Sequence, residues 1–381
     1  MKVGVNMDFK LSEEQKQYQS EIHKFCKEFL NKETSLESFS HDAWKELSDF
    51  GILGLTISEE QGGLGENYVT AAVAMEALGY GCINNGLIFV ATNHIWVALN
   101  IISLYGNDSQ RQKYLPAMVS GENIGAFALT EADAGSDAMS LTTVAQQEGA
   151  GYRINGSKMF ISNAPIADIF IVIALTRQSP KEYTAFIVEK DFEGVKVGKP
   201  LPKMGLDSCP ISEVTFEQCY VPAENILGRI GAGNIIMNEV ITWERCYEFA
   251  PHVGAMQRVM ERCVAYVNER KQSGKCIKEY QAISHKIADM QIAVELSRNM
   301  LFKVAWLKDQ GKKAYREAAI LKVFASENYI KTCQNAMQIM GAYGYAKEYG
   351  IERELRDAMA SSIYSGTSEI QRNTIFQLIT L

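Results

Sequence analysis

The run at 127–137, FALTEADAGSD, is the densest cluster of small and polar residues in the chain and is rich in hydroxyls and carboxylates. It begins like a strand and passes into a turn at Gly135. Such a turn directs backbone N–H groups at a ligand, and Thr130 and Ser136 add hydroxyl donors. A solvated β-turn explains the same residues, so this run alone leaves a binding site and a plain turn open.

A second group suits a planar aromatic ligand. Residues 158–163, KMFISN, place Phe160 and Ser162 two positions apart, and therefore on one face of a strand. An aromatic ring and a hydroxyl on one face suit a heteroaromatic cofactor, although burial of Phe160 in a core is the alternative. Farther along, residues 338–344 interrupt a helix with two glycines, and residues 364–372, YSGTSEIQR, form a loop that enters a terminal helix.

Hydrophobic periodicity indicates the elements that hold these residues. Helical spacing covers the first third, short β-branched and aromatic runs separated by Gly, Pro, Asn and Asp cover the middle, and long helical segments return afterwards. We predict an α+β chain of three domains. These are an N-terminal helical domain at 1–122, a central antiparallel β domain at 123–228 and a C-terminal four-helix-bundle domain at 229–381.

The composition is that of an ordinary globular protein, with 47% hydrophobic and 22% charged residues in 381. A net charge of −7 argues against a nucleic-acid partner. Apolar runs such as 169–175 and 86–91 are shorter than the ~20 residues of a membrane helix, and residues 1–14 carry no apolar signal segment. We therefore expect no membrane span, no secretory signal and a cytoplasmic location.

The eight cysteines and five histidines show neither a CxxC pair nor the spacing of a metal site. We therefore expect no structural metal. Buried reduced thiols explain the cysteines, and none is assigned to catalysis.

Taken together, these segments resemble the acyl-CoA dehydrogenase family of flavoproteins, in the family's order and over nearly the whole chain. Further stretches at 59–65 (EEQGGLG), 203–205 (KMG), 269–271 (ERK) and 356–358 (RDA) support the resemblance. It implies an FAD that lies between the β domain and the C-terminal bundle, within a homotetramer in which each flavin also touches a neighbouring subunit.

The resemblance also implies which residues bind FAD. The positions that match the family's motifs are Phe127, Leu129, Thr130, Gly135, Ser136, Phe160, Ser162, Arg270, Gln281, Gln338, Gly341, Ala342, Thr367 and Glu369. Many relatives have Trp where this chain has Phe160 and Gly where it has Ala342. We expect FAD to bind with weaker stacking.

Oxidation of an acyl thioester between Cα and Cβ requires a carboxylate that removes the α-proton. Many family members carry this Glu immediately before a Gly-Thr pair, where this chain has Ser365. The isovaleryl and long-chain branches place it earlier, just before an Arg, and here Glu244 precedes Arg245. The resemblance therefore implies that Glu244 is the base and that the Ser365 backbone N–H polarises the thioester oxygen. An apolar site beside Trp243 should raise the pKa of Glu244.

The residues expected at the substrate are Ser136, Thr242, Arg245, His94 and Trp96. Thr242 replaces an Asp that helps to place CoA in relatives, which leaves room for phosphopantetheine on a carrier protein. The size of His94 and Trp96 favours a short or cyclic acyl group, although a hydrogen-bonded core histidine is the alternative for His94. The chain looks most like the branch that oxidises prolyl groups on peptidyl carrier proteins, as in cyanobacterial anatoxin biosynthesis.

Several alternatives remain open. Lys271, Lys275 and Lys278 either dock an acidic carrier protein or form a solvated face. Glu244 either is the base or belongs to a surface ion pair. Three functions are therefore open. The chain is a carrier-protein dehydrogenase or oxidase, a short- or branched-chain acyl-CoA dehydrogenase, or a catalytically silent flavin- or carrier-binding scaffold. The sequence does not distinguish an electron-transfer flavoprotein from oxygen as the electron acceptor.

Overall fold

The computed structural model describes residues 10–31 and 36–380. The expectation that the chain lacks a secretory signal concerns residues 1–14, of which 1–9 lie outside the described residues. The chain divides into two compact units. The first comprises Met1–Thr34, Asn67–Asn85 and Arg245–Leu381, and the second comprises Ser35–Glu66 and Gly86–Glu244.

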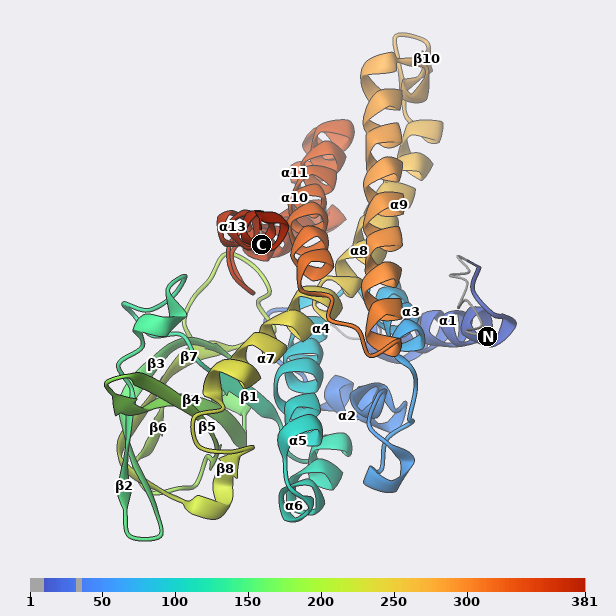
Figure 1. Cartoon of the computed structure of the whole chain (residues 1–381). Helices are drawn as coiled ribbons and strands as arrows, with labels where there is room; N and C mark the ends of the chain where they lie inside the picture. The colour runs from blue at the N-terminus through green and yellow to red at the C-terminus, as the bar shows by residue number, and fades with distance from the viewer. Residues whose placement is uncertain (1–9, 32–35, 381) are drawn as a thin grey trace. The chain divides into compact units, whose positions relative to one another are not determined.

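The first unit consists of helices and one two-stranded hairpin. The helices are α1 (Glu13–Phe25), α3 (Tyr68–Gly81), α8 (Ala250–Glu269), α9 (Gln281–Asp309), α10 (Tyr315–Met340), α11 (Ala342–Tyr345), α12 (Ile351–Met359) and α13 (Ser368–Thr380). The hairpin pairs β9 (Lys271–Gln272) with β10 (Lys275–Cys276) and joins α8 to α9. The long helices α8, α9 and α10 pack on one another, as Figure 1 shows, and α3 packs on α8 and α9.

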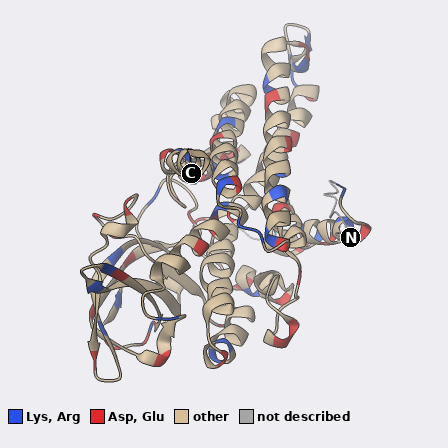
Figure 2. Cartoon of the chain, in the orientation of Figure 1, with Lys and Arg blue, Asp and Glu red and all other residues tan. Residues whose placement is uncertain are grey.

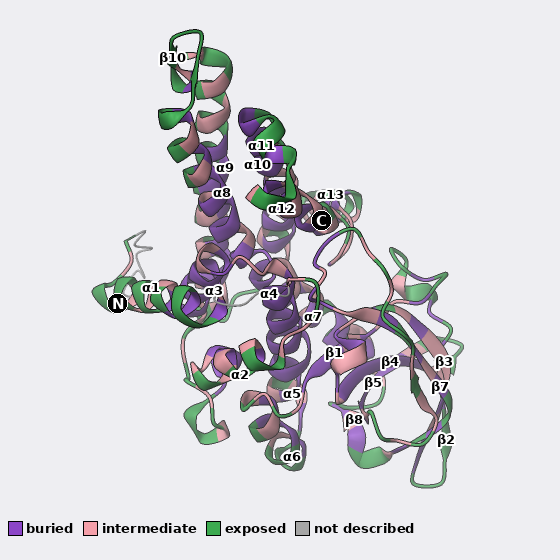
Figure 3. Cartoon of the chain, turned by 180° about the vertical axis from the view of Figure 1, so that it is seen from behind, coloured by how far each residue is buried: buried purple, intermediate pink, exposed green. Residues whose placement is uncertain are grey.

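A buried polar network ties together segments of the first unit that are distant in sequence. Arg258 of α8 lies 2.9 and 3.1 Å from the two carboxylate oxygens of Glu354 on α12. The same guanidinium donates to the Cys82 carbonyl at 2.7 Å and also to the Gly79 carbonyl. Asn85 donates to Glu354 at 3.0 Å. Because a buried charge is tolerated only with such partners, Arg258 fixes α3 and α12 against α8, whose inner face is buried (Figure 3).

The second unit combines helices with an eight-stranded sheet. Its helices are α2 (His41–Asp49), α4 (Asn85–Thr92), α5 (Asn100–Tyr105), α6 (Asp108–Val119) and α7 (Gly233–Tyr247), the last of which belongs to this unit up to Glu244. The strands are β1 (Gly125–Ala128), β2 (Val144–Glu148), β3 (Gly151–Ser162), β4 (Ile169–Gln178), β5 (Lys181–Glu189), β6 (Val195–Val197), β7 (Ile211–Pro222) and β8 (Ile226–Leu227).

The sheet is mixed. Its strand order is β6-β7-β3-β2-β4-β5-β8, and β1 pairs with β4 outside this path. The predicted antiparallel pairing is present along most of the sheet, whereas β1 and β2 each run parallel to β4. Alternation of side chains along a strand indicates which face is buried but not the direction of the neighbouring strand, so these two pairings could not be predicted from the sequence.

The helical run Asn85–Tyr105 has the length of a membrane span, with a mean hydropathy of 1.8. Of its most apolar window, 83% is buried inside the protein, as expected for a core helix. The apolar run at residues 86–91 is thus one part of a longer core helix, which also contains the polar residues Asn93 and His94. Both polar side chains are satisfied internally: Asn93 donates to the Phe89 carbonyl at 2.9 Å, and His94 bonds two backbone groups.

Candidate functional site

A buried ion pair holds the turn after β1 against strand β3. Lys158 Nζ lies 2.9 Å from Glu131 Oε1 and donates to the Leu129 carbonyl at 3.0 Å. The Met159 N–H donates to the Thr130 carbonyl at 2.8 Å. Leu129 and Thr130, two of the expected flavin residues, are thereby fixed beside β3.

Both members of this pair are ionised near neutral pH. Burial alone would raise the pKa of Glu131, but the Lys158 ammonium and hydrogen bonds from Thr143 and Thr142 lower it to about 2. Burial lowers the pKa of Lys158 to about 8 even though Glu131 opposes this shift. Phe127 precedes the pair on β1 and is half-buried, whereas Gly135 and Ser136 are exposed at the far end of the turn.

Phe160 is a large aromatic residue that the sheet leaves uncovered. Its exposed fraction is 58%, and its φ of 59° lies in the left-handed region. The β3–β7 register shifts between Lys158 and Ile161, both of which are buried, so Met159 and Phe160 form a bulge between two inward-facing residues. Ser162, half-buried, follows on the same strand. An exposed ring on a strained backbone is typical of a ligand contact, and this surface fits the flat ring system of a flavin.

Five further expected FAD residues lie on the first unit. The Arg270 guanidinium lies over the Tyr343 ring, 5.5 Å from its centroid, and so meets the turn at Gly341 and Ala342. Gly341 ends α10 with a φ of 59°, and no atom lies within 4 Å of the position that a Cβ would take. The remaining two are helix residues: Gln281 is the first residue of α9, and Gln338 lies in the last turn of α10.

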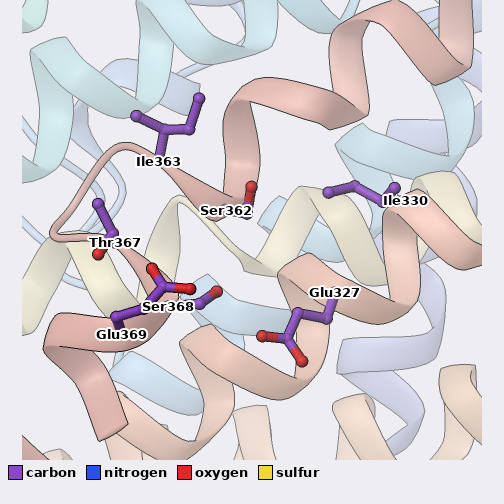
Figure 4. A pocket seen from close by; sticks show the side chains of 7 residues that line it. All are labelled: Glu327, Ile330, Ser362, Ile363, Thr367, Ser368 and Glu369. Carbon is purple, nitrogen blue, oxygen red and sulfur yellow. The ribbon is translucent and has the colours of Figure 1, made fainter. Parts of the chain in front are cut away.

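A pocket of about 340 Å³ opens at the start of α13 (Figure 4). Its lining residues are Glu327, Ile330, Ser362, Ile363, Thr367, Ser368 and Glu369. Two of them, Thr367 and Glu369, belong to the expected FAD set. Hydrogen bonds from its own backbone N–H and from the Thr367 hydroxyl lower the pKa of Glu369. The pocket therefore combines an ionised carboxylate with hydroxyls and suits a polar part of a ligand, such as ribose.

The loop before α13 holds Ser365 rigidly. Its φ is 57°, and its carbonyl accepts hydrogen bonds from Gln371 Nε2 at 2.9 Å and from Arg245 Nε at 3.4 Å. Its hydroxyl donates to Glu248 Oε2 at 3.1 Å. Among the hydrogen bonds of the described residues, none uses the Ser365 N–H. A loop held by these bonds thus carries a backbone donor that bonds no other described group, as the expected oxyanion site requires.

Glu244 lies near the end of α7 and is half-buried. The preceding Trp243 is buried and stacks on Trp96, with ring centroids 5.9 Å apart and an angle of 13° between the rings. Thr242 is buried as well, and its hydroxyl donates to the Asn238 carbonyl at 2.8 Å. The side chains that precede Glu244 are therefore engaged in packing and helix contacts.

His94 has the environment of a core histidine. Its Nε2 lies 2.9 Å from the Met118 carbonyl, and its Nδ1 accepts from the Gly125 N–H at 2.9 Å. Burial lowers the pKa of His94 to about 4, so the ring is neutral at physiological pH. Both ring nitrogens bond the backbone, which favours the alternative that the sequence left open, a hydrogen-bonded residue of the core.

The three lysines considered for carrier docking lie at one end of α8 and α9 (Figure 2). Lys275 lies 4.2 Å from the centroid of the Tyr280 ring, and Lys278 donates to Asn268 at 2.8 Å. Lys271 is exposed on β9. Local partners for two of the three are typical of a solvated face.

The eight cysteines all fall within the described ranges and are free thiols, and all but Cys276 are buried. Burial raises the pKa of Cys82 and of Cys219 to about 11, so these thiols stay protonated. Within 10–31 and 36–380, no group of three His, Cys, Asp or Glu residues is placed to hold a metal.

Two charged residues of these sites escaped the sequence analysis. Lys158 was part of a quoted motif but received no role, since nothing in the sequence links it to Glu131. Glu248 is 1% exposed and bonds Ser365, yet it stands alone in an aromatic and apolar stretch.

The chain belongs to the acyl-CoA dehydrogenase family. The family's N-terminal, middle and C-terminal domains match residues 12–122, 126–219 and 231–379. The predicted α+β fold, the FAD cofactor and the class of enzyme, an FAD-dependent dehydrogenase, are thereby confirmed.

Its relatives include enzymes that act on carrier proteins. It is 37% identical to an L-prolyl-[peptidyl-carrier protein] dehydrogenase of Pseudomonas fluorescens, over 98% of this chain and 100% of the relative. Among solved structures, it resembles the prolyl acyl carrier protein oxidase AnaB, at a TM-score of 0.96 and 38% identity over 98% of this chain and 100% of AnaB. It also resembles PigA with FAD and proline, at a TM-score of 0.96 and 34% identity over 98% and 100% of the two chains.

Proposed function

We propose that this enzyme oxidises a prolyl group, held as a thioester on a peptidyl or acyl carrier protein, between its α- and β-carbons. The observation that carries the proposal is the turn at Ser365, whose backbone N–H bonds no group of the described residues while its carbonyl and hydroxyl are both hydrogen-bonded. Similarity over the full length to prolyl carrier-protein enzymes supports the choice of substrate.

In this proposal the Ser365 N–H binds the thioester carbonyl and acidifies the α-hydrogen, because negative charge that develops on the oxygen is stabilised there. Arg245 and Gln371 donate to the Ser365 carbonyl and so help to hold the loop that carries this N–H. Glu244 removes the α-proton as general base. Bound FAD supplies the acceptor for the hydride that leaves the β-carbon.

Each unit, taken by itself, carries residues whose chemistry suits FAD. On the second unit, Thr130, Phe160 and Ser162 offer two hydroxyls and an exposed ring. On the first unit, Arg270 offers a cation for a phosphate group, and Thr367 and Glu369 line the pocket at α13. The chemistry of these donors matches a ligand that combines a flat ring, ribose and phosphate.

Thr242 supports carrier-bound over CoA-bound substrate, because its short hydroxyl is occupied by the Asn238 carbonyl and leaves no carboxylate for pantetheine at that position. A short- or branched-chain acyl-CoA dehydrogenase is the second candidate, and the family membership favours it over a catalytically silent scaffold.

We further propose that the enzyme is a homotetramer that passes electrons to an electron-transfer flavoprotein or to oxygen. Exposed apolar side chains on two helices of the first unit support assembly, because single-chain proteins rarely leave such residues uncovered in groups. They are Ile292 and Leu296 on α9, and Phe376 and Ile379 on α13.

Anaerobic flavin bleaching tests the reaction and its substrate together. Purified holoenzyme is mixed with prolyl-loaded carrier protein, prolyl-CoA, butyryl-CoA and isovaleryl-CoA, and the flavin absorbance is followed. We expect fast bleaching with the prolyl carrier protein. Fast bleaching with an acyl-CoA alone would establish the second candidate, and no bleaching with any thioester would indicate the scaffold.

A further inference from the structure

We propose that Trp96 is a positioning residue for the base of the reaction. It stacks on Trp243, the residue that precedes Glu244, and thereby fixes where the Glu244 carboxylate lies relative to the α-carbon of the substrate. This inference rests on the proposed function, because it requires Glu244 as the base. It adds a residue that acts through Glu244 and not on the substrate.

The contact between the two tryptophans is direct, and both rings belong to the second unit. Their centroids lie 5.9 Å apart with an angle of 13° between the rings, and Trp96 is 0% and Trp243 2% exposed. Two large rings that are packed on each other inside the protein have little freedom to turn. Trp243 and Glu244 are neighbours near the end of α7, so a fixed Trp243 limits the movement of the helix end that carries Glu244.

The helix that carries Trp96 departs from α-helical geometry at this residue. Between α4 and α5 the chain forms a π-helical segment, Asn93–Leu99, and the Asn100 N–H donates to the carbonyl of Ile95, five residues earlier. Such segments are rare, place an extra residue in the turn and occur frequently at functional sites. The extra residue changes the direction in which the side chains of the segment point, and here Trp96 lies on Trp243.

His94 holds this segment in place. Its Nδ1 accepts from the Gly125 N–H at the start of β1, and its Nε2 donates to the Met118 carbonyl in the last turn of α6, both at 2.9 Å. The ring also meets Trp44 edge-on, with centroids 5.2 Å apart. Three contacts therefore fix the residue that lies two positions before Trp96.

Proton removal is sensitive to small displacements of the base. A displacement of about 1 Å, caused by a change remote from the chemistry, lowers a rate about 10²-fold. If an aliphatic side chain replaces the stacked ring of Trp96, Trp243 gains freedom to turn, and Glu244 moves with it. The loss should therefore appear in the rate of proton removal and not in the binding of the substrate.

Anaerobic stopped-flow reduction of the holoenzyme flavin by prolyl-loaded carrier protein tests this role. We expect Trp96→Leu to lower the limiting rate about ten- to hundredfold, while the carrier concentration that gives half of this rate changes by less than about twofold. Trp96→Phe keeps a ring against Trp243 and should lose less than about fivefold. Trp96→Met fills more of the volume than Leu and should behave like it, so the test remains decisive if the Leu variant does not fold.

Three comparisons separate positioning from stability. Unfolded enzyme lowers the amplitude of bleaching but not its rate constant. Phe186→Leu removes another buried ring of the second unit, whose centroid lies 5.4 Å from that of Tyr152, and should keep the limiting rate within about twofold of wild type. In the Glu244→Gln background, Trp96→Leu should add less than about a twofold loss, because a residue that acts through the base has no effect once the base is absent.

Several results would contradict this role of Trp96. A wild-type limiting rate in the Leu and Met variants would overturn it while the proposed function stands. A raised half-saturating concentration at an unchanged limiting rate, or a full further loss in the Glu244→Gln background, would show that Trp96 acts on the substrate itself and would overturn it too. If wild type bleaches with isovaleryl-CoA alone, the prolyl substrate fails, and the same comparison with isovaleryl-CoA decides the role of Trp96. If wild type bleaches with neither thioester, the proposed function and this inference both fail.

Discussion

Two non-glycine residues with positive φ, Phe160 at 59° in a bulge of β3 and Ser365 at 57° in the loop before α13, lie in motifs that the sequence indicates as candidates for binding. Such backbone conformations cost about 1–3 kcal/mol each and persist where the surroundings hold them. Under Phe160 the Lys158–Glu131 pair fixes the neighbouring turn, and at Ser365 hydrogen bonds from Gln371 and Arg245 fix the carbonyl. At Phe160 the strained backbone leaves a ring exposed, and at Ser365 it carries an N–H that bonds no group of the described residues.

The substitution Phe160→Gly tests the role of the ring apart from the strain of the backbone. Glycine adopts a φ of 59° without strain, and the lost side chain is 58% exposed, so the thermal unfolding midpoint of the apoprotein should not fall. FAD affinity should weaken about tenfold because ring stacking is lost. Titration of apoprotein with FAD measures this, with Phe160→Trp as the control that keeps or tightens binding. Unchanged affinity in the glycine variant would remove Phe160 from the flavin site.

Glu244→Gln should abolish proton removal without affecting the fold. An amide cannot accept the α-proton, so the rate of flavin reduction should fall by about 10²- to 10⁴-fold while FAD stays bound. Stopped-flow absorbance under anaerobic conditions gives this rate. Glu239→Gln, on the same helix, is the matched control and should reduce at the wild-type rate. A near-wild-type rate in Glu244→Gln would place the base elsewhere.

At the scale of elements, a buried ion pair fixes the turn after β1 to strand β3. Lys158 reaches across to Glu131 and to the Leu129 carbonyl, and Thr142 and Thr143 donate to the same carboxylate from the start of β2. A surface ion pair would contribute little, whereas removing one partner of a buried pair is strongly destabilising.

Acid should reduce the stabilisation that the Lys158–Glu131 ion pair provides, in a defined pH range. The pKa of Glu131 is about 2 in the fold against an ordinary value of 4.5, so its stabilisation is complete above about pH 4.5 and is lost as the pH falls through 2. Lys158 stays charged in this range because its pKa is about 8. The difference in unfolding free energy between wild type and Glu131→Gln should therefore shrink between pH 5 and 2, by about 1.4 kcal/mol per unit of pKa difference. Urea unfolding at several pH values measures it, and a constant difference would contradict the lowered pKa.

Periodicity in the sequence predicted the order of elements because helical and strand spacings differ, and each bundle or sheet needs one buried face. It could not predict the parallel pairing of β1 and β2 with β4, since strand partners depend on contacts across the sheet. Short motifs indicated the flavin-binding family and the candidate site residues Phe160 and Ser365. They did not indicate Glu248 or the Lys158–Glu131 pair, because a buried charge is recognised only when its distant partner is known.

At the scale of the whole molecule, each compact unit is assembled from segments far apart in the sequence. In the first unit Arg258 joins the end of α3 to α8 and α12. In the second unit β4 pairs with β1 and β2, which precede it in the sequence, and with β5, which follows it. The same unit that carries Ser365 also carries the exposed apolar residues of α9 and α13. We therefore expect assembly to protect these residues from water.

The proposed tetramer gives a prediction at this scale. Wild type should have four times the chain mass of 42.5 kDa in sedimentation equilibrium. Ile292→Lys combined with Leu296→Lys, whose side chains are 54% and 52% exposed, should lower the mass, because two charges would be buried at the interface. Lys substitution at Glu269, an exposed residue of α8, is the control for added charge. An unchanged tetramer in the double variant would place the interface on other residues.

The most direct test of the central claim is intact-protein mass spectrometry of a prolyl-loaded carrier protein after incubation with the holoenzyme and an electron acceptor. The proposed α,β-oxidation predicts that the acylated carrier loses the mass of at least two hydrogens with wild type, and keeps its mass with Glu244→Gln. A prolyl carrier protein of unchanged mass, under conditions in which the same enzyme oxidises butyryl-CoA or isovaleryl-CoA, would contradict the claim.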